Sequence, residues 1–173
     1  MSEQRIELSQ SDAGTWSSNP VTDGPLRVCL IRLGGEFFAI PLSNVREVFK
    51  LESITCVPGM PAALVGVANL RGTIVPIADL RPSLGLSHAA QPQFVVVVRQ
   101  GEGEIGLLID EVPEIRTVTA DELVADTTTE TMRRPFFSGR LNIENRLCVI
   151  LDVEGILASM EKSTLQIVGA SQG

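Results

Sequence analysis

The sequence predicts an all-β protein with a few short helices, folded as two related subdomains of about five strands each. Three observations carry this prediction. Apolar residues make up 44% of the 173 positions, which is enough for a buried core. They fall in short runs rich in β-branched residues, broken by glycine, proline, asparagine and charged residues, as is typical of strands and tight turns. The second half of the chain also repeats the pattern of the first.

The predicted strands form one set in each half of the chain. Each run has the length of a strand and ends near a turn-forming or charged residue. The first set covers residues 26–33, 36–41, 45–49, 62–70 and 73–79, and the second covers 94–99, 104–109, 112–119, 138–143 and 146–151. Helical patterns are brief, at residues 78–84, 120–124 and 153–160. Many short strands with little helix indicate small barrels or a sandwich.

Two segments of the first half can be aligned with two segments of the second half without internal gaps. Residues 39–48 match 106–115, and residues 66–80 match 139–153. The second match places Gly72 and Asn145 at the same point between two strand-like runs. Because glycine and asparagine tolerate a positive φ best, we expect the same tight hairpin turn in both halves.

The ends of the chain differ from its middle. Residues 1–24 are polar and lack a periodic apolar pattern, so we predict a flexible tail with Trp16 exposed to solvent. The folded domain is expected at residues 25–160, with subdomains at about 36–90 and about 94–152 plus swapped segments, and a short C-terminal tail at 161–173.

Composition excludes several classes of function. Fourteen lysines and arginines against 21 aspartates and glutamates give a net charge of −7, which disfavours binding to nucleic acid or to an anionic membrane. The absence of tyrosine and a single tryptophan disfavour base stacking. The N-terminus lacks the apolar core of a signal peptide, and no apolar run approaches the ~20 residues of a membrane span. We therefore expect a cytoplasmic protein without direct membrane insertion.

Cysteine usage agrees with that location. Cys29, Cys56 and Cys148 are an odd number at wide spacings, which fits neither a disulfide framework nor a zinc site. Each lies in or beside an apolar stretch. The prediction is three buried free thiols in a reducing compartment.

Two motifs imitate catalytic or cofactor sites. Residues 101–106 match the dinucleotide pattern G-x-G-x-x-G, but they lead into a strand, and Glu102 and Glu104 would repel phosphate, so we predict a hairpin turn. Asp79 and Asp152 are related by the repeat but lack the Asp-Thr/Ser-Gly loop of aspartic proteases. Each follows a strand and precedes a short helix, so we predict helix N-caps.

His88, the only histidine, lies in a polar loop and is expected to be solvated. A two-histidine metal site is therefore excluded. The sequence predicts no catalytic residue, no cofactor and no metal. A binding function is favoured, and an enzyme with an unrecognised site is the least favoured alternative.

A family resemblance covers residues 26–160. Its most specific piece is Asn69-Leu-Arg-Gly72 followed by Ile74-Val-Pro-Ile-Ala-Asp79, preceded by Phe37-Phe-Ala-Ile-Pro-Leu-Ser-Asn-Val-Arg-Glu-Val48. The second half fits in outline through Ile105-Gly-Leu-Leu-Ile-Asp-Glu-Val112 and Leu147-Cys-Val-Ile-Leu-Asp152. These segments closely resemble the CheW family of chemotaxis coupling proteins.

The resemblance implies two interlocked five-stranded SH3-like barrels and an adaptor without catalysis. The implied partners are the regulatory domain of a CheA-type histidine kinase, at the barrel ends, and the cytoplasmic tips of methyl-accepting chemoreceptors, in a groove between the subdomains. A CheW-like adaptor of another pathway, such as type IV pilus signalling, is the alternative.

By motif position, the resemblance implies that Val45, Gly66 and Val112 line the receptor-binding groove. The residues alone leave open that the two valines are core residues and that Gly66 only relieves crowding. If all three line one channel, a bulky residue at Gly66 should block a receptor helix without unfolding the protein.

Glu47 and Arg71 are implied to form a structural salt bridge. Both lie in apolar stretches, and a partly desolvated carboxylate needs a matched donor, for which arginine can supply two parallel hydrogen bonds. Whether the pair is buried or exposed is left open, and removing Arg71 should cost about 3–5 kcal/mol in the first case and about 0–1 kcal/mol in the second. Glu114 and Glu144 stand at the corresponding positions of the second half, and we therefore expect no such pair there.

Overall fold

The computed structural model describes residues 25–87, 91–125 and 136–170. The predicted N-terminal tail with Trp16, and His88, lie outside these described residues. The strands are β1 (Leu26–Leu33), β2 (Glu36–Pro41), β3 (Val45–Lys50), β4 (Leu64–Leu70), β5 (Thr73–Ala78), β6 (Phe94–Gln100), β7 (Gly103–Ile109), β8 (Glu114–Val118), β9 (Leu123–Val124), β10 (Phe137–Ile143) and β11 (Arg146–Leu151). The helices are η2 (Leu42–Asn44), α1 (Arg81–Leu84), η3 (Ala120–Glu122) and α2 (Val153–Ala170).

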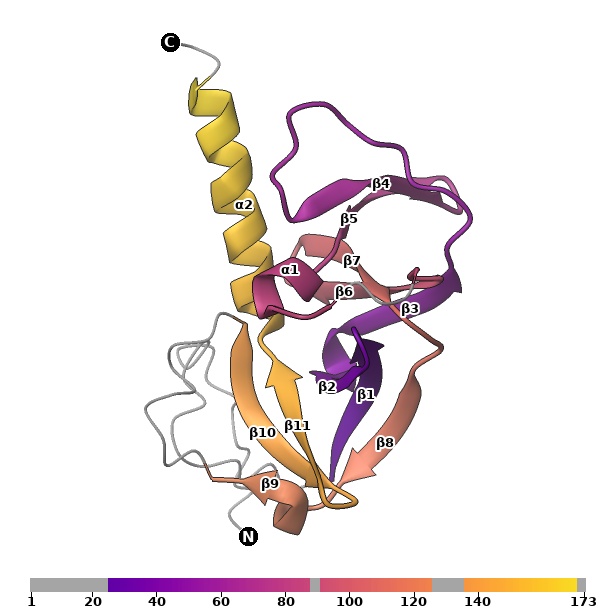
Figure 1. The fold of residues 1–173 in the computed structure, drawn as a ribbon, viewed down its shortest axis with the longest axis vertical. Helices are drawn as coiled ribbons and strands as arrows, with labels where there is room; N and C mark the ends of the chain where they lie inside the picture. The colour runs from indigo at the N-terminus through magenta and orange to yellow at the C-terminus, as the bar shows by residue number, and fades with distance from the viewer. Residues whose placement is uncertain (1–24, 88–90, 126–135, 171–173) are drawn as a thin grey trace, which may run out of the picture.

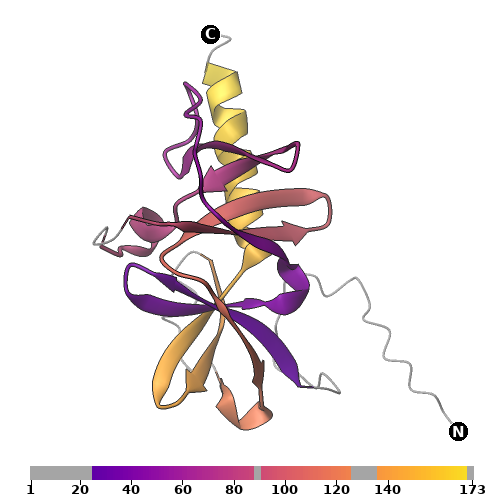
Figure 2. The same cartoon turned by 90° about the vertical axis from the view of Figure 1, so that its right-hand side faces the viewer.

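The strands form two curled sheets, one above the other in Figures 1 and 2. One sheet has the order β8-β1-β2-β11-β10-β9 and is called barrel A, and the other has the order β3-β6-β7-β5-β4 and is called barrel B. The all-β class with two barrels and few helices is confirmed. Barrel A gains the short strand β9 where the sequence predicted the end of a helical turn.

The barrels exchange hairpins between the two halves of the chain. β1–β2 belongs to barrel A although it precedes β3, and β6–β7 belongs to barrel B. Barrel B is therefore the continuous stretch 45–109, whereas barrel A joins 26–41 to 114–151. The expected ranges 36–90 and 94–152 do not coincide with the sheets. The exchanged hairpins are apolar on both faces, so each packs against the central core with one face and against the interior of its barrel with the other.

The exchange follows a pseudo-twofold relationship that extends to single residues. Ala39 of β2 pairs with Ile150 of β11 in a parallel register. Their repeat equivalents, Gly106 of β7 and Ile77 of β5, form the matching parallel pair in barrel B. The alignment of the two halves therefore reproduces the register of the sheets.

The two predicted hairpin turns have the same geometry. Arg71 and Gly72 have φ of 50° and 88°, and Glu144 and Asn145 have φ of 51° and 63°. Positive φ at both central residues of a two-residue loop is the type I′ turn that suits the twist of paired strands. The expected equivalence of the two turns is confirmed.

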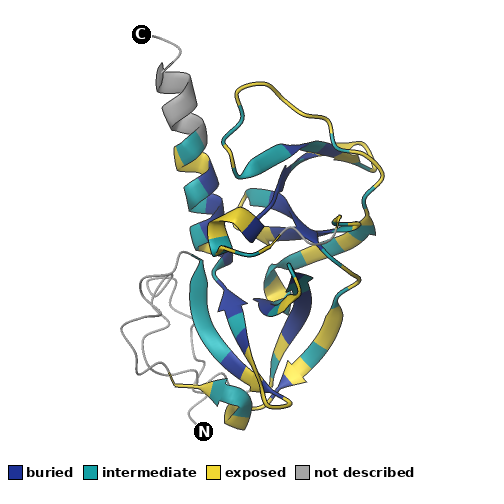
Figure 3. Ribbon diagram, in the orientation of Figure 1, coloured by how far each residue is buried: buried dark blue, intermediate teal, exposed yellow. Residues whose placement is uncertain are grey.

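Three apolar cores hold the fold together, and their buried residues are dark blue in Figure 3. A central core between the barrels takes residues from both, including Ile31, Leu33 and Ile40 of barrel A and Val96 and Leu107 of barrel B. Smaller cores fill the interior of each barrel. Because β1 and β6 contribute to the central core with one face and to a barrel interior with the other, they read as continuous apolar runs.

Helix α2 seals the central core and is longer than the sequence predicts. Val153, Ile156, Leu157 and Met160 are buried at the spacing of one helical face. The helix continues to Ala170, so the predicted tail at 161–173 is wrong up to that residue. No proline interrupts the sequence after Met160, so the backbone can continue as a helix beyond it.

Candidate interaction site

The three residues expected in one groove occupy different environments. Val45 is half-buried at the start of β3, pairs with Val98 and packs against the central core. Val112 lies in the link between β7 and β8, and 64% of it is exposed. Val112 is thus available to a partner, whereas much of Val45 serves the core.

Gly66 is buried in β4, and the segment Ile54–Thr55 covers it. A Cβ added to Gly66 would lie 2.4 Å from the carbonyl oxygen of Thr55 and 2.5 Å from Cγ2 of Ile54. Its φ of 154° also favours glycine. The geometry contradicts the expectation that a bulky residue here leaves the fold intact, because the collision involves backbone. The alternative that Gly66 relieves crowding agrees with this contact.

Glu47 and Arg71 approach each other only loosely. The Nη1 of Arg71 is 3.9 Å from Oε2 of Glu47, which is longer than a hydrogen bond, and 90% of the Arg71 side chain is exposed. The expected ion pair is therefore present, with the Glu47 side chain 27% exposed, but the two side chains form no hydrogen bond, so the expectation of two parallel bonds is wrong. Exposed ion pairs of this kind contribute about 0–1 kcal/mol.

Barrel A carries a different ion pair at this turn, which the sequence reasoning missed. Glu144, at the position of Arg71, accepts a hydrogen bond of 2.9 Å from Nη1 of Arg116 on β8. This bond lowers the pKa of Glu144 and raises that of Arg116. The expectation that Glu114 and Glu144 cannot repeat the pair agrees with this geometry, but it overlooked Arg116, two positions from Glu114 on the same face of the strand.

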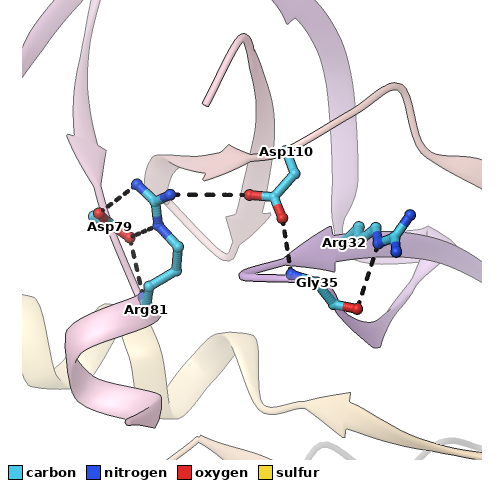
Figure 4. Close-up of polar contacts among 5 residues, drawn as sticks. All are labelled: Arg32, Gly35, Asp79, Arg81 and Asp110. Atoms are coloured by element: carbon cyan, nitrogen blue, oxygen red, sulfur yellow. Dashed lines mark hydrogen bonds and ion pairs between the residues drawn. The ribbon is translucent and has the colours of Figure 1, made fainter. Parts of the chain in front are cut away.

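The buried ion pair of the described chain lies elsewhere, between β5 and α1 (Figure 4). Nε and Nη2 of Arg81 donate to Oδ1 and Oδ2 of Asp79, each at 2.9 Å, and the backbone N of Arg81 donates to the same Oδ1 at 3.0 Å. Asp79 and Arg81 are 6% and 4% exposed. The hydrogen bonds to Asp79 raise the pKa of Arg81. This is the paired carboxylate–guanidinium geometry that was expected of Glu47 and Arg71.

The two aspartates related by the repeat have different roles. Oδ1 of Asp152 accepts from the backbone N of Gly155 at 3.1 Å, which confirms the N-cap of α2. Asp79 lies one residue before the N-cap of α1 and holds Arg81 instead. The Gly101 motif forms the β6–β7 turn, which confirms that prediction.

Exposed apolar side chains occur at repeat-equivalent positions of the two barrels. Ile74 and Leu147, which follow the two type I′ turns, are 61% and 60% exposed. Val48 and Ile115 form a second equivalent pair with exposed surface. Single exposed apolar residues are common on protein surfaces, but their recurrence at matched positions favours a role in contacts with other proteins.

The cysteines divide into two kinds. All three are free, with Cys29 and Cys148 buried and Cys56 exposed. The prediction of three buried thiols is therefore wrong for Cys56, which directly follows the segment Ile54–Thr55 that covers Gly66. Burial raises the pKa of Cys29, and it raises the pKa of Cys148 to about 12.

Within residues 25–87, 91–125 and 136–170, no group of three or more histidine, cysteine, aspartate or glutamate side chains is placed to hold a metal ion. None of the helices in the described part of the chain is long and apolar enough to cross a membrane. The candidate interaction surface in the described residues is made of exposed apolar side chains and ion pairs.

Two β barrels with exchanged hairpins and apolar side chains at matched surface positions define a double-barrel protein-interaction module. The family model of the CheW-like domain matches residues 27–161. The chain therefore belongs to the CheW family.

Individual relatives agree with this assignment. The chain is 31% identical to a probable chemotaxis protein CheW of Rhizobium etli, over 85% of this chain and 97% of that protein. It is also 31% identical to the chemotaxis protein CheW of Helicobacter pylori, over 91% and 98% of the two chains. The crystal structure of the scaffolding protein TtCheW from Thermoanaerobacter tengcongensis shares the fold, with a TM-score of 0.65, 24% identity and coverage of 79% and 90%.

Proposed function

We propose that this chain is a chemotaxis coupling protein that joins a CheA-type histidine kinase to methyl-accepting chemoreceptors without performing catalysis itself. The observation that carries the proposal is the similarity to chemotaxis proteins across nearly the whole domain, from residue 27 to 161. The double barrel supports it, because two linked units can hold two partners at once.

The kinase regulatory domain is proposed to bind at the barrel ends. Ile74 and Leu147 lie beside the turns at these ends and expose more than half of their surface. Burial of exposed aliphatic side chains at the centre of an interface supplies binding free energy at about 25 cal/mol per Å² of apolar area before the costs of association.

The receptor tip is proposed to bind near Val112. A helix that lays one apolar face on a surface needs a few apolar anchors, and Val112 is 64% exposed. Val45 is proposed to add to this surface from its half-buried position at the start of β3. The role of Gly66 is proposed to be indirect, because it lets the segment Ile54–Thr55 lie close against β4.

One relative favours a second candidate function. The protein PilI of Pseudomonas aeruginosa is 41% identical to this chain, over 47% of each protein. An adaptor of type IV pilus signalling would keep the same double barrel and the same kinds of partner. The two candidates differ in which kinase and receptor the chain meets in its own cell.

Capture from the native cell tests the proposal. The full chain carrying an affinity tag is expected to retain a CheA-type kinase and a chemoreceptor, which mass spectrometry identifies. Recovery of pilus-signalling partners in their place would favour the second candidate. Recovery of neither kinase nor receptor from cells that express both would contradict the coupling role.

A further inference from the structure

The pseudo-symmetry of the fold breaks at the link that presents Val112. This link, residues 110–113, crosses from barrel B to barrel A. The equivalent crossing in the first half runs through η2, where the side-chain amide of Asn44 donates to the Arg99 carbonyl at 3.1 Å and to Gln100 at 2.6 Å. The valine after η2 is half-buried, whereas Val112 is largely exposed. Different interactions therefore hold the two crossings in place.

Asp110, the first residue of the link, is fixed from several sides (Figure 4). Its backbone N donates to the carbonyl of Arg32 at 2.9 Å, and its Oδ2 accepts from the backbone N of Gly35 at 3.1 Å. Both partners belong to the β1–β2 hairpin of barrel A. The next residue, Glu111, forms an ion pair with Arg32, with 3.4 Å between Oε1 of Glu111 and Nη1 of Arg32.

The other carboxylate oxygen of Asp110 faces barrel B. Oδ1 is buried, accepts no hydrogen bond among the described residues, and lies 4.0 Å from Nη1 of Arg81. Nε and Nη2 of the Arg81 guanidinium donate hydrogen bonds to Asp79. These two bonds fix the plane of the guanidinium, and its Nη1 points toward Asp110 (Figure 4). Because the Arg81 side chain is only 4% exposed, water screens its attraction to the Asp110 carboxylate weakly.

We propose that the network of Asp79, Arg81 and Asp110 is a preformed brace that holds the β7–β8 link and thereby positions Val112 for the apolar face of a partner helix. Arg81 and Asp110 are positioning residues, and Val112 makes the contact. Holding the link before binding reduces the conformational entropy lost when the partner arrives. The identity of the partner rests on the proposed function, whereas the brace itself does not.

Two substitutions at Asp110 separate its contacts. Asp110→Ala removes the acceptor of Gly35 and the charge facing Arg81, whereas Asp110→Asn keeps an oxygen for Gly35 and removes only the charge. Methyl NMR of Val112, assigned by the signal lost in Val112→Ala, reports the position of the link. Amide exchange at Gly35 reports its hydrogen bond, and the melting temperature reports the global fold.

In Asp110→Ala, the Val112 methyl signals are expected to shift and the Gly35 amide to exchange about tenfold faster, which corresponds to the loss of one hydrogen bond. In Asp110→Asn, the methyl signals are expected to shift while Gly35 stays protected. An unshifted Val112 signal in either folded variant overturns the proposal. If Asp110→Ala does not fold, Asp110→Asn decides by the same criterion.

Binding provides a second readout. Affinity for a helical hairpin fragment of a chemoreceptor tip is expected to fall about tenfold in Asp110→Ala, and affinity for the kinase regulatory domain to change less than about twofold. Equal losses for both partners, with a lowered melting temperature, would assign the network to general stability and overturn the brace. If the wild-type chain fails to bind the receptor fragment, the proposed function fails, while the methyl and exchange measurements still decide the brace.

Discussion

Arg71 and Glu144 occupy the same position in two equivalent type I′ turns and carry opposite charges. Their φ angles are 50° and 51°, and each lies near a charge of the other sign on another strand of the same sheet, Glu47 of β3 for Arg71 and Arg116 of β8 for Glu144. The barrels therefore share a backbone plan but differ electrostatically at this end. A partner that recognises one turn by its charge is expected to discriminate against the other.

The first prediction contrasts an exposed arginine with a buried one. Arg71→Ala is expected to change the free energy of unfolding by about 0–1 kcal/mol, because its ion pair is solvated. Arg81→Met is expected to cost about 3–5 kcal/mol, because it leaves the carboxylate of Asp79 buried without its partner. Urea denaturation of both variants measures the difference. Similar losses in the two variants would show that exposure does not distinguish these pairs.

The second prediction concerns crowding at Gly66. Gly66→Ala is expected to destabilise the fold by about 1–3 kcal/mol more than Gly72→Ala, because its Cβ collides with Ile54–Thr55. Gly72 is the matched control, since it also has a positive φ but nothing within 4 Å of an added Cβ. Thermal melts of both variants provide the comparison. A smaller loss at Gly66 than at Gly72 would mean that the covering segment moves aside at no cost.

The third prediction concerns thiol reactivity. In the native protein, an aromatic disulfide reagent at neutral pH is expected to modify Cys56 quickly, because it is exposed, and Cys29 and Cys148 only after unfolding. The number of thiols released before and after adding denaturant measures this. Cys56→Ser is the control and should remove the fast phase. A fast phase that persists in this variant would place another thiol at the surface.

The fourth prediction follows from the pKa of Cys148. Burial raises it from 9.0 to about 12, so the unfolded chain loses this proton first as the pH rises. The stabilisation from the buried neutral thiol is complete below pH 9 and is lost between pH 9 and about 12, with a slope approaching 1.4 kcal/mol per pH unit. Denaturation at several alkaline pH values should show a shallower slope in Cys148→Ala. Identical slopes would show that Cys148 titrates alike in both states.

Much of the fold follows from local pattern. Strand positions and turns could be predicted because alternation, β-branching and the Arg71-Gly72 and Glu144-Asn145 pairs are local signals, and the repeat extends them to register. Pairing across the central core could not be predicted in the same way. Arg81 and Asp110 are far apart in sequence, and no spacing rule joins them. The length of α2 was missed because the polar residues 161–164 interrupt the apolar pattern after Met160, although no proline ends the helix there.

The candidate site was predicted less completely for a related reason. Motif position identified Val112, whose exposure agrees with a contact role, but it could not tell that Gly66 lies beneath Ile54–Thr55. The Asp79-Leu-Arg81 motif was visible in the sequence, yet the short spacing suggested only an N-cap. A guanidinium that folds back onto an aspartate two residues earlier depends on the burial that the surrounding core provides.

Simultaneous binding of both partners tests the central claim most directly. The full chain is mixed with a CheA-type regulatory domain and a chemoreceptor tip fragment from the same cell, and sedimentation velocity measures the species formed. The coupling role predicts a ternary complex heavier than either binary complex, because kinase and receptor use separate surfaces. Mutually exclusive binding, in which each partner displaces the other from the chain, would contradict it.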